Sequence, residues 1–358
     1  MKHCRTLLIS FILTVITLAI YSCKQSIPIE PEDTSVPGRR DYTWTIDTVY
    51  SPMNYFHAIW GSSPEDVWVC GPGGDGPEWV QHYDGSKWTP YTKNGGVYIG
   101  GNTLFGFSKD NIYLGGEGAY ILHYDGNSWK GNYIYEIQGV HDRLITDIWG
   151  KRADDLYACG IFSEGVPSQD SENYKGFILH YDGQSWKEVV RADFKSQFLS
   201  IRKAGDRVYV LSFTRNCQDS YNSKVEFYEL KGSQLSRIYS NAEGSITWAS
   251  HHVIGDKIYF VIGKEIYRYN GSRLVKIISS SEKNFGYQCY GRSEKDMFIR
   301  MNDGVAHYNG TDIQYIYKFQ DKSANITNEP LILDKDIFFT VWGTGKGRNM
   351  ILHGRLKE

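Results

Sequence analysis

Six side chains outside the regular repeats of this chain combine aromatic rings with charged groups. They are Tyr135, Tyr174, Arg215, Trp248, Asp142 and Glu164. Aromatic rings stack on the apolar faces of sugars or peptides, while carboxylates and guanidinium groups hydrogen-bond to their polar groups. The set therefore predicts non-catalytic binding of a glycan or of a protein surface. Asp142 and Glu164 could instead act as acid and base in glycoside hydrolysis, which needs two carboxyl groups about 5–9.5 Å apart.

Other side chains that could take part in chemistry are better explained by a structural role. Five histidines lie near the ends of apolar runs in different repeats, so they cannot converge on one metal ion: His82, His123, His180, His307 and His353. Residues 343–347 resemble a phosphate-binding loop, but no Ser or Thr follows Lys346 and no helix begins there. We therefore expect no metal and no cofactor. The formal net charge of −2, without a basic stripe, argues against a nucleic-acid-binding protein.

Two short phrases recur at a spacing of roughly 45 residues, which is the period of a propeller blade. The first is an Asp followed closely by an aliphatic and an aromatic residue, in seven copies at Asp66, Asp110, Asp155, Asp206, Asp256, Asp296 and Asp336. The second is a Gly with a large apolar residue three positions later, in six copies at Gly85, Gly126, Gly183, Gly232, Gly271 and Gly310. The repeats predict an all-β fold, a seven-bladed β-propeller with four antiparallel strands in each blade.

Residues 145–190 show the repeating unit most clearly. Four runs rich in β-branched and aromatic residues, at 145–150, 156–159, 177–181 and 185–190, are separated by turns or loops. Asp182-Gly183 predicts a tight type I′ turn, in which both central residues have positive φ. No stretch after residue 40 has a sustained helical period, so we expect almost no helix.

The seventh copy of the first phrase has no second phrase after it, so the last blade lacks its outer strand. Residues 42–49 form an unassigned strand pattern before the first blade, and Trp44 matches the position of Trp88 in the second phrase. We expect residues 42–50 to pair beside residues 350–355. This closure would remove two sheet edges that would otherwise be open to aggregation.

The order of strands assigns every loop to one of two faces of the ring. The turns on one face are short and uniform, whereas the longest loops, including 161–176 and 212–224, lie on the other face. Long loops on a rigid scaffold commonly carry binding sites. We therefore expect the ligand at the mouth of the axial channel on the long-loop face, near Tyr135, Tyr174, Arg215 and Trp248.

The N-terminus has the features of a bacterial lipoprotein. Residues 1–22 combine Lys2 and Arg5 with an apolar run, as in a signal peptide, and Cys23 follows Ile20-Tyr21-Ser22 as in a lipobox. We expect lipid on Cys23 and a disordered tether over residues 23–40, which are rich in Pro and acidic residues. The propeller is expected over residues 41–358.

The remaining cysteines divide into two groups. Cys70 and Cys159 occupy the same position in the second strands of blades 1 and 3, too far apart to pair, and we expect them to be small buried hydrophobes. Cys217 in a loop and Cys289 in an inner strand could form a disulfide, and the sequence leaves this open.

The repeats resemble those of β-propeller lipoproteins of Bacteroidetes-type bacteria. The matching motifs are Ile59-Trp60-Gly61, Asp66-Val67-Trp68 and His82-Tyr83-Asp84-Gly85-Ser86-Lys87-Trp88. The resemblance implies a lipoprotein of the bacterial cell envelope, expected at the outer membrane, and implies no activity. We expect a non-catalytic binding module for a glycan or an envelope protein. The alternatives are a glycan-active enzyme that uses loop carboxylates and a structural subunit of an assembly.

Overall fold

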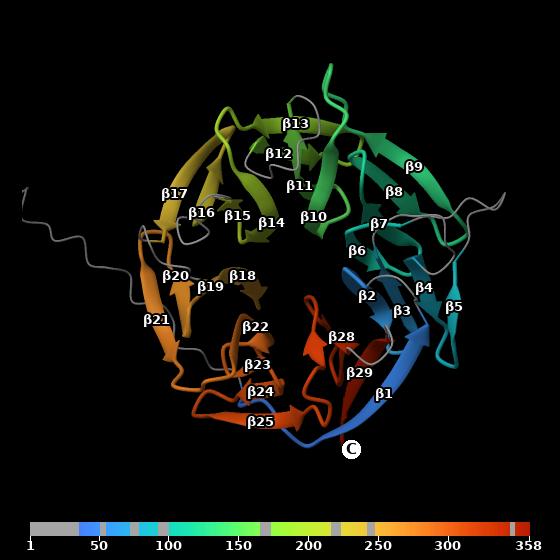
Figure 1. The fold of residues 1–358 in the computed structure, drawn as a ribbon, viewed down its shortest axis with the longest axis vertical. Helices are drawn as coiled ribbons and strands as arrows, with labels where there is room; N and C mark the ends of the chain where they lie inside the picture. Colours follow the sequence, from blue (N-terminus) through green and yellow to red (C-terminus); the bar gives the residue numbers. More distant parts are fainter. Residues whose placement is uncertain are drawn as a thin grey trace, which may run out of the picture. The chain divides into compact units, whose positions relative to one another are not determined.

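The computed structural model describes residues 36–50, 55–71, 79–91, 100–164, 173–215, 223–241, 248–343 and 348–358. The leader, Cys23 and most of the tether lie outside these residues, as does Cys217. The described residues form seven four-stranded antiparallel units arranged as a ring (Figure 1), and they contain no α-helix. No helix among them is long and apolar enough to cross a membrane. The predicted all-β seven-bladed β-propeller is confirmed.

Six blades are each built from four consecutive strands. Blades 1 to 3 contain β2 (Ala58–Ser63), β3 (Asp66–Cys70), β4 (Val80–Tyr83) and β5 (Trp88–Pro90); β6 (Thr103–Ser108), β7 (Asn111–Gly115), β8 (Tyr120–Tyr124) and β9 (Trp129–Ile134); and β10 (Arg143–Arg152), β11 (Asp155–Ser163), β12 (Tyr174–Tyr181) and β13 (Trp186–Arg191). Blades 4 to 6 contain β14 (Gln197–Ala204), β15 (Arg207–Thr214), β16 (Lys224–Lys231) and β17 (Gln234–Ser240); β18 (Ala249–Ile254), β19 (Lys257–Ile262), β20 (Glu265–Tyr269) and β21 (Leu274–Ser279); and β22 (Phe285–Ser293), β23 (Asp296–Met301), β24 (Gly304–Tyr308) and β25 (Ile313–Lys318). The first strand of each blade lies nearest the axis (Figure 1).

Blade 7 joins the two ends of the propeller. Strand β1 (Tyr42–Tyr50) pairs antiparallel with β29 (Arg348–Leu356), from Tyr42 opposite Leu356 to Tyr50 opposite Arg348. The next strand inward is β28 (Asp336–Gly343), and the inner edge is split into β26 (Asn325–Ile326) and β27 (Leu331–Ile332). The predicted closure by an N-terminal strand is confirmed.

The propeller begins before β1. The Gly38 amide donates a hydrogen bond to the Lys295 carbonyl, 2.7 Å away, in the turn between β22 and β23. The Arg40 guanidinium contacts both the carboxylate and the carbonyl of Asp312 in the next turn of blade 6. The folded domain therefore extends to Val36, and residues 38–40 belong to it rather than to the tether.

The recurring Gly turn differs from the predicted type. Gly183 has a φ of 89°, but Asp182 is absent from the described non-Gly residues with positive φ. A type I′ turn with Asp182 and Gly183 at its centre needs positive φ at both residues, so this turn is not of that type. The Asp182 carboxylate is used instead as an acceptor for the amides of Gln184 and Ser185. The type I′ prediction was wrong because this side chain satisfies the turn amides in place of a left-handed backbone.

The five histidines of the repeats hold their own blades together. His82, His180, His307 and His353 each hydrogen-bond through Nε2 to the Asp that opens the second strand of the same blade, and His123 bonds to Asn111 in the same way. His82 also stacks on Trp68, with ring centroids 4.2 Å apart. Their structural interpretation is confirmed. No group of three metal-binding side chains occurs in the part of the chain that the structure describes.

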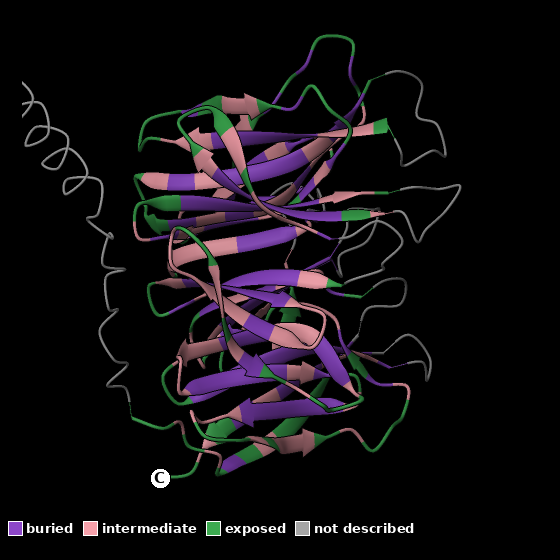
Figure 2. Ribbon diagram, turned by 90° about the vertical axis from the view of Figure 1, so that its left-hand side faces the viewer, coloured by how far each residue is buried: buried purple, intermediate pink, exposed green. Residues whose placement is uncertain are grey.

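The hydrophobic core is distributed between blades because neighbouring sheets bury each other's faces (Figure 2). One cluster joins Ile121 of blade 2 to Leu179 of blade 3, and another joins Phe298 of blade 6 to Leu352 of blade 7. A single blade could not bury these faces alone. Cys70, Cys159 and Cys289 are fully buried free thiols, which confirms the prediction for the first two.

Candidate functional site

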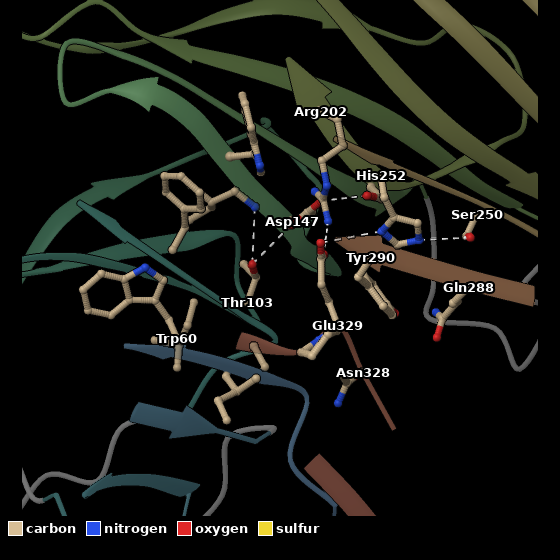
Figure 3. Close-up of a pocket in the computed structure, with 18 of the residues that line it drawn as sticks. Trp60, Thr103, Asp147, Arg202, Ser250, His252, Gln288, Tyr290, Asn328 and Glu329 are labelled. Carbon is tan, nitrogen blue, oxygen red and sulfur yellow. Dashed lines mark hydrogen bonds and ion pairs between the residues drawn. The ribbon is translucent and has the colours of Figure 1, made fainter. Parts of the chain in front are cut away.

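A cavity of about 530 Å³ lies at the axis of the ring and is the candidate site (Figure 3). It is lined by β2, β6, β10, β14, β18 and β22, and by residues 328–332 of blade 7. Most of its lining comes from the first half of each inner strand. The cavity therefore lies toward the face on which the long loops enter these strands.

Strand register shows that the blades contribute equivalent residues to this cavity. One residue of each blade lies opposite the aromatic or aliphatic position of the second strand, as Trp60 lies opposite Trp68 and Arg202 lies opposite Tyr209. We call these residues the inner tier: Trp60, Phe105, Trp149, Arg202, His252, Tyr290 and Leu331. Side chains two positions apart on a strand share a face. The residues two positions earlier therefore form an outer tier: Ala58, Thr103, Asp147, Ser200, Ser250, Gln288 and Glu329.

The inner tier has two chemically different halves. Blades 1 to 3 supply aromatic rings, and those of Phe105 and Trp149 lie 6.0 Å apart. Trp60 is held against blade 2, since a Cβ on Gly106 would lie 2.8 Å from its ring. Blades 4 to 6 supply Arg202, His252 and Tyr290 at the equivalent positions. A ligand in the cavity would therefore meet aromatic surface on one side and polar groups on the other.

Arg202 is the centre of the polar half. Its side chain is only 7% exposed, and its two terminal nitrogens bond separately to Asp147 and Glu329. Asp147 also accepts hydrogen bonds from the Ser200 hydroxyl and the Ile201 amide, each at 2.9 Å. Glu329 is different, because 46% of its side chain is exposed and its second oxygen makes no hydrogen bond with the described residues. One guanidinium thus links two carboxylates, one enclosed and one open.

These contacts determine the charge of the site. Burial raises the pKa of Asp147, and the Arg202 charge and the Ile201 amide oppose that rise. The pKa of Glu329 is lowered because the Arg202 charge outweighs the effect of burial. Asp147 accepts three hydrogen bonds through one oxygen, which favours its ionised form. The arrangement holds Glu329 as an open anion and Asp147 as an enclosed carboxyl group paired with Arg202.

Two adjacent histidines complete the polar half, and hydrogen-bond accounting identifies their tautomers. The Ser250 hydroxyl donates to the Tyr287 carbonyl, so it must accept the hydrogen on Nε2 of His252. The Ser200 hydroxyl donates to Asp147 and in the same way accepts from Nε2 of His251. Burial lowers the pKa of both histidines, strongly for His251. Both rings are therefore neutral, with an unprotonated Nδ1.

The structure places the six side chains predicted from sequence around this face but not in the cavity. Tyr174 donates a 2.5 Å hydrogen bond to Asp142, which raises the pKa of Tyr174 to about 12. Glu164 forms an ion pair with Lys175. Because Tyr174 and Lys175 are consecutive in β12, Asp142 and Glu164 lie on opposite faces of the blade and do not form an acid–base pair.

The other three predicted residues are separate from one another. Tyr135 is buried between blades 2 and 3, where it packs on Phe177 and its hydroxyl contacts Glu188 and Arg191. Arg215 is exposed at the end of a described segment. Trp248 is 63% exposed just before β18, the inner strand that carries Ser250 and His252. None of the six is among the described residues that line the cavity.

The cavity residues could have been found from the repeats. Trp60, Phe105, Trp149 and Tyr290 each precede a Gly in their inner strands, and Arg202 and His252 replace that aromatic residue in blades 4 and 5. An alignment of inner strands would have shown a charged group at a position that is otherwise aromatic. It would not have shown that Glu329 reaches Arg202 across the ring, because their separation in sequence is 127 residues.

Comparisons with known proteins agree with the fold. No protein-family model and no curated protein matches this sequence. Among solved structures, the chain is similar to YCF48 bound to a D1 peptide, with a TM-score of 0.58, 15% identity, and coverage of 90% of this chain and 100% of that chain. It is also similar to YCF48 from Cyanidioschyzon merolae, with a TM-score of 0.54, 13% identity, and coverage of 86% and 98%.

The WD40 β-propeller domain of Doa1 is a further similar structure, with a TM-score of 0.52, 11% identity, and coverage of 88% of this chain and 98% of that chain. At such identities the likeness shows the fold alone. The chain is a seven-bladed β-propeller.

Proposed function

We propose that this protein is a non-catalytic binding module of the bacterial cell envelope, anchored through lipid on Cys23. Its ligand is a glycan or an envelope protein that enters the axial cavity from the long-loop face. The observation that carries this proposal is the two-tier cavity, which joins an aromatic half to an ordered polar half. Concave sites with apolar walls and a few fixed polar groups are typical of ligand recognition.

Two further observations support binding by this face. Large hydrophobic side chains are exposed on segments leading into inner strands, among them Tyr55, Phe194, Leu199 and Trp248. Exposed apolar groups around a concave polar site are common where a macromolecule docks. A propeller of the same fold, YCF48, has been solved with a bound peptide, which supports a peptide or protein ligand here as well.

The catalytic alternative has less support. The loop carboxylates Asp142 and Glu164 face away from each other, and Asp147 and Glu329 share one guanidinium. A glycosidase requires one carboxyl group to be protonated near neutral pH. The cavity carboxyl whose pKa is raised, Asp147, is enclosed, and its Oδ2 already accepts hydrogen bonds from Ser200, Ile201 and Arg202, so it is not open to a glycosidic oxygen.

The test is a glycan array together with a pull-down from envelope extract, both with the full-length chain in detergent. Any ligand is then titrated against Trp149→Leu, which removes an aromatic wall, and against Tyr133→Leu as a control outside the cavity. We expect at least about 10-fold weaker binding for Trp149→Leu, equivalent to about 1.4 kcal/mol, and little change for the control. Unchanged affinity in Trp149→Leu would place the ligand elsewhere, and turnover of a bound glycan would replace the binding module with an enzyme.

A further inference from the structure

We propose that the cavity recognises a lysine side chain presented by a protein partner, with its ammonium group bonded to Glu329 beside His252. This inference rests on the proposed function, because it names the ligand class of the same cavity. It follows from the charge of the site, from the acceptors left unused, and from the shape of its aromatic half.

The charge of the cavity calls for a cation. Asp147 and Glu329 contribute two negative charges, Arg202 contributes one positive charge, and His251 and His252 are neutral. These groups sum to one unit of negative charge, and the nearby Arg300 guanidinium is bonded to the side chains of Gln288 and Asn325 rather than to either carboxylate. A bound ammonium group would neutralise this charge through a direct charge-assisted hydrogen bond to the open Glu329 carboxylate.

The unused acceptors lie close together. Oε1 of Glu329 lies 3.6 Å from Nδ1 of His252 (Figure 3). Since the hydrogen of His252 is on Nε2, two acceptors face each other with no proton between them. An ammonium group would donate to the open Oε1 at about 2.9 Å, while Nδ1, which the surrounding atoms cover, places no competing proton beside that oxygen.

A buried hydroxyl supports the same location. Tyr290 is 3% exposed, and its hydroxyl has no hydrogen-bond partner among the described residues. The Tyr290 ring packs against that of His252 with centroids 4.4 Å apart. An unsatisfied buried hydroxyl is costly and commonly marks a place where a ligand or water completes the structure.

The remaining polar groups argue against a sugar as the main ligand. Thr103 and Ser200 donate to Asp147, and Ser250 donates to the Tyr287 carbonyl. Gln288 uses its oxygen to accept from Arg300. A pyranose presents hydroxyls around its whole ring and needs several free partners, whereas this site leaves its free groups on one side. The aromatic rings opposite suit the aliphatic stem of lysine.

The geometry also distinguishes lysine from arginine. Arginine pairs best with a carboxylate through two parallel hydrogen bonds that use both oxygens. Here Oε2 of Glu329 is already bound to Arg202, so only one oxygen is available. A compact ammonium group can bond fully to a single oxygen, while a guanidinium group would lose its preferred two-bond geometry.

The experiment compares three peptides by calorimetry with the full-length chain in detergent. The probes are acetyl-Gly-Gly-Lys-Gly-Gly-amide, the same peptide with Nε-acetyl-lysine, and the same peptide with arginine. We expect the lysine peptide to bind at least about 10-fold more tightly than the acetylated peptide and several-fold more tightly than the arginine peptide. Equal binding of the lysine and acetylated peptides, or no binding of the lysine peptide at about 10 mM, would overturn the inference.

Two variants test whether Glu329 is the residue that recognises the ammonium charge. Glu329→Gln should weaken the lysine peptide at least about 10-fold, because the anion is lost while the shape is kept. Glu136→Gln is the matched control, since Glu136 is an exposed acid in a loop on the same face and does not line the cavity. Equal effects of the two variants would contradict the assignment. A glucosamine trimer that binds more tightly than the lysine peptide and depends on Glu329 would also reject a protein partner.

Failure of the lysine inference can be distinguished from failure of the proposed function. If a ligand from the array or the pull-down depends on Trp149 but no lysine peptide binds, the cavity is a binding site and the lysine inference alone fails. If neither depends on the cavity, both fail.

Discussion

At the scale of single residues, Arg202 decides whether the polar half of the cavity is stable. Removing it would leave Asp147 buried without its charged partner, which is one of the more destabilising changes a core can undergo. We expect Arg202→Met to lower the free energy of unfolding by about 3 kcal/mol. Chemical denaturation measures this. Arg207→Met is the control, because the ion pair of Arg207 with Glu229 is long and half exposed, and such pairs contribute about 1 kcal/mol or less.

A second substitution separates charge from packing. If the cost of Arg202→Met comes from the unpaired carboxylate, then Asp147→Asn in the same chain should recover part of the lost stability. If the double variant is as unstable as the sum of the two single variants, the guanidinium contributes mainly by packing.

His251 makes the stability of the propeller depend on pH. Burial, the nearby Arg202 charge and His252 lower the pKa of His251 well below 6.5. Near pH 6.5, His251 therefore binds a proton in the unfolded chain but not in the folded chain. The contribution of His251 to the free energy of unfolding is fully present above pH 6.5. It falls by about 1.4 kcal/mol per pH unit as the pH drops toward the pKa of the folded state.

The measurement is the denaturation midpoint at pH 7.5, 6.5 and 5.5. His251→Gln should reduce the slope between the two lower pH values by close to one proton, whatever its effect on stability at pH 7.5. His141→Gln, at an exposed loop position, is the matched control. An unaltered slope in His251→Gln would show that the ring is protonated in the folded state.

At the scale of elements, β1 is the strand on which closure of the ring depends. Without it, β29 would present an open edge, which favours aggregation. We expect deletion of residues 24–50 to yield insoluble protein and deletion of residues 24–35 to leave stability unchanged. Deletion of residues 24–40 should be intermediate, with a loss of about 1–3 kcal/mol, because it removes the Arg40 bonds to Asp312.

Solubility and denaturation midpoints of the three deletions provide the measurement. The substitution Arg40→Ala removes the side-chain bonds to Asp312 that the deletion of residues 24–40 also removes, but it keeps the backbone. If residues 24–40 can be removed without loss, the contacts at Gly38 and Arg40 contribute nothing to the fold.

The strands were predictable from the sequence because each blade repeats the same local signals. A turn Gly, and an Asp followed closely by an aliphatic and an aromatic residue, are signals that act over a few positions, so a single chain reveals them. The candidate site was not predictable in the same way. Its key contacts join Arg202 to Asp147 and to Glu329 from different blades, and only ring closure brings these together. The loop residues Tyr135 and Tyr174 were chosen by residue type, and the structure gives each a protein partner.

At the scale of the whole molecule, the two faces of the ring carry different features. Most strand residues that line the cavity lie in the first halves of inner strands, as Thr103 and Ser250 do. Residues 38–40 attach to turns of blade 6 on the opposite face, at Lys295 and Asp312. A chain tethered through Cys23 would therefore be held by the short-turn face. The cavity would point away from the membrane, where a large partner could reach it.

This arrangement gives the last prediction. With lipid on Cys23, the full-length chain should associate with vesicles, and Cys23→Ala should release it. In a Cys217→Ser chain, fluorophores placed by Gln184→Cys on the short-turn face and by Glu136→Cys on the long-loop face report the orientation. Twelve tether residues extend at most about 40 Å, so a quencher in the bilayer should act more strongly at position 184. Stronger quenching at position 136 would mean that the cavity faces the membrane, and a soluble partner could not then be its ligand.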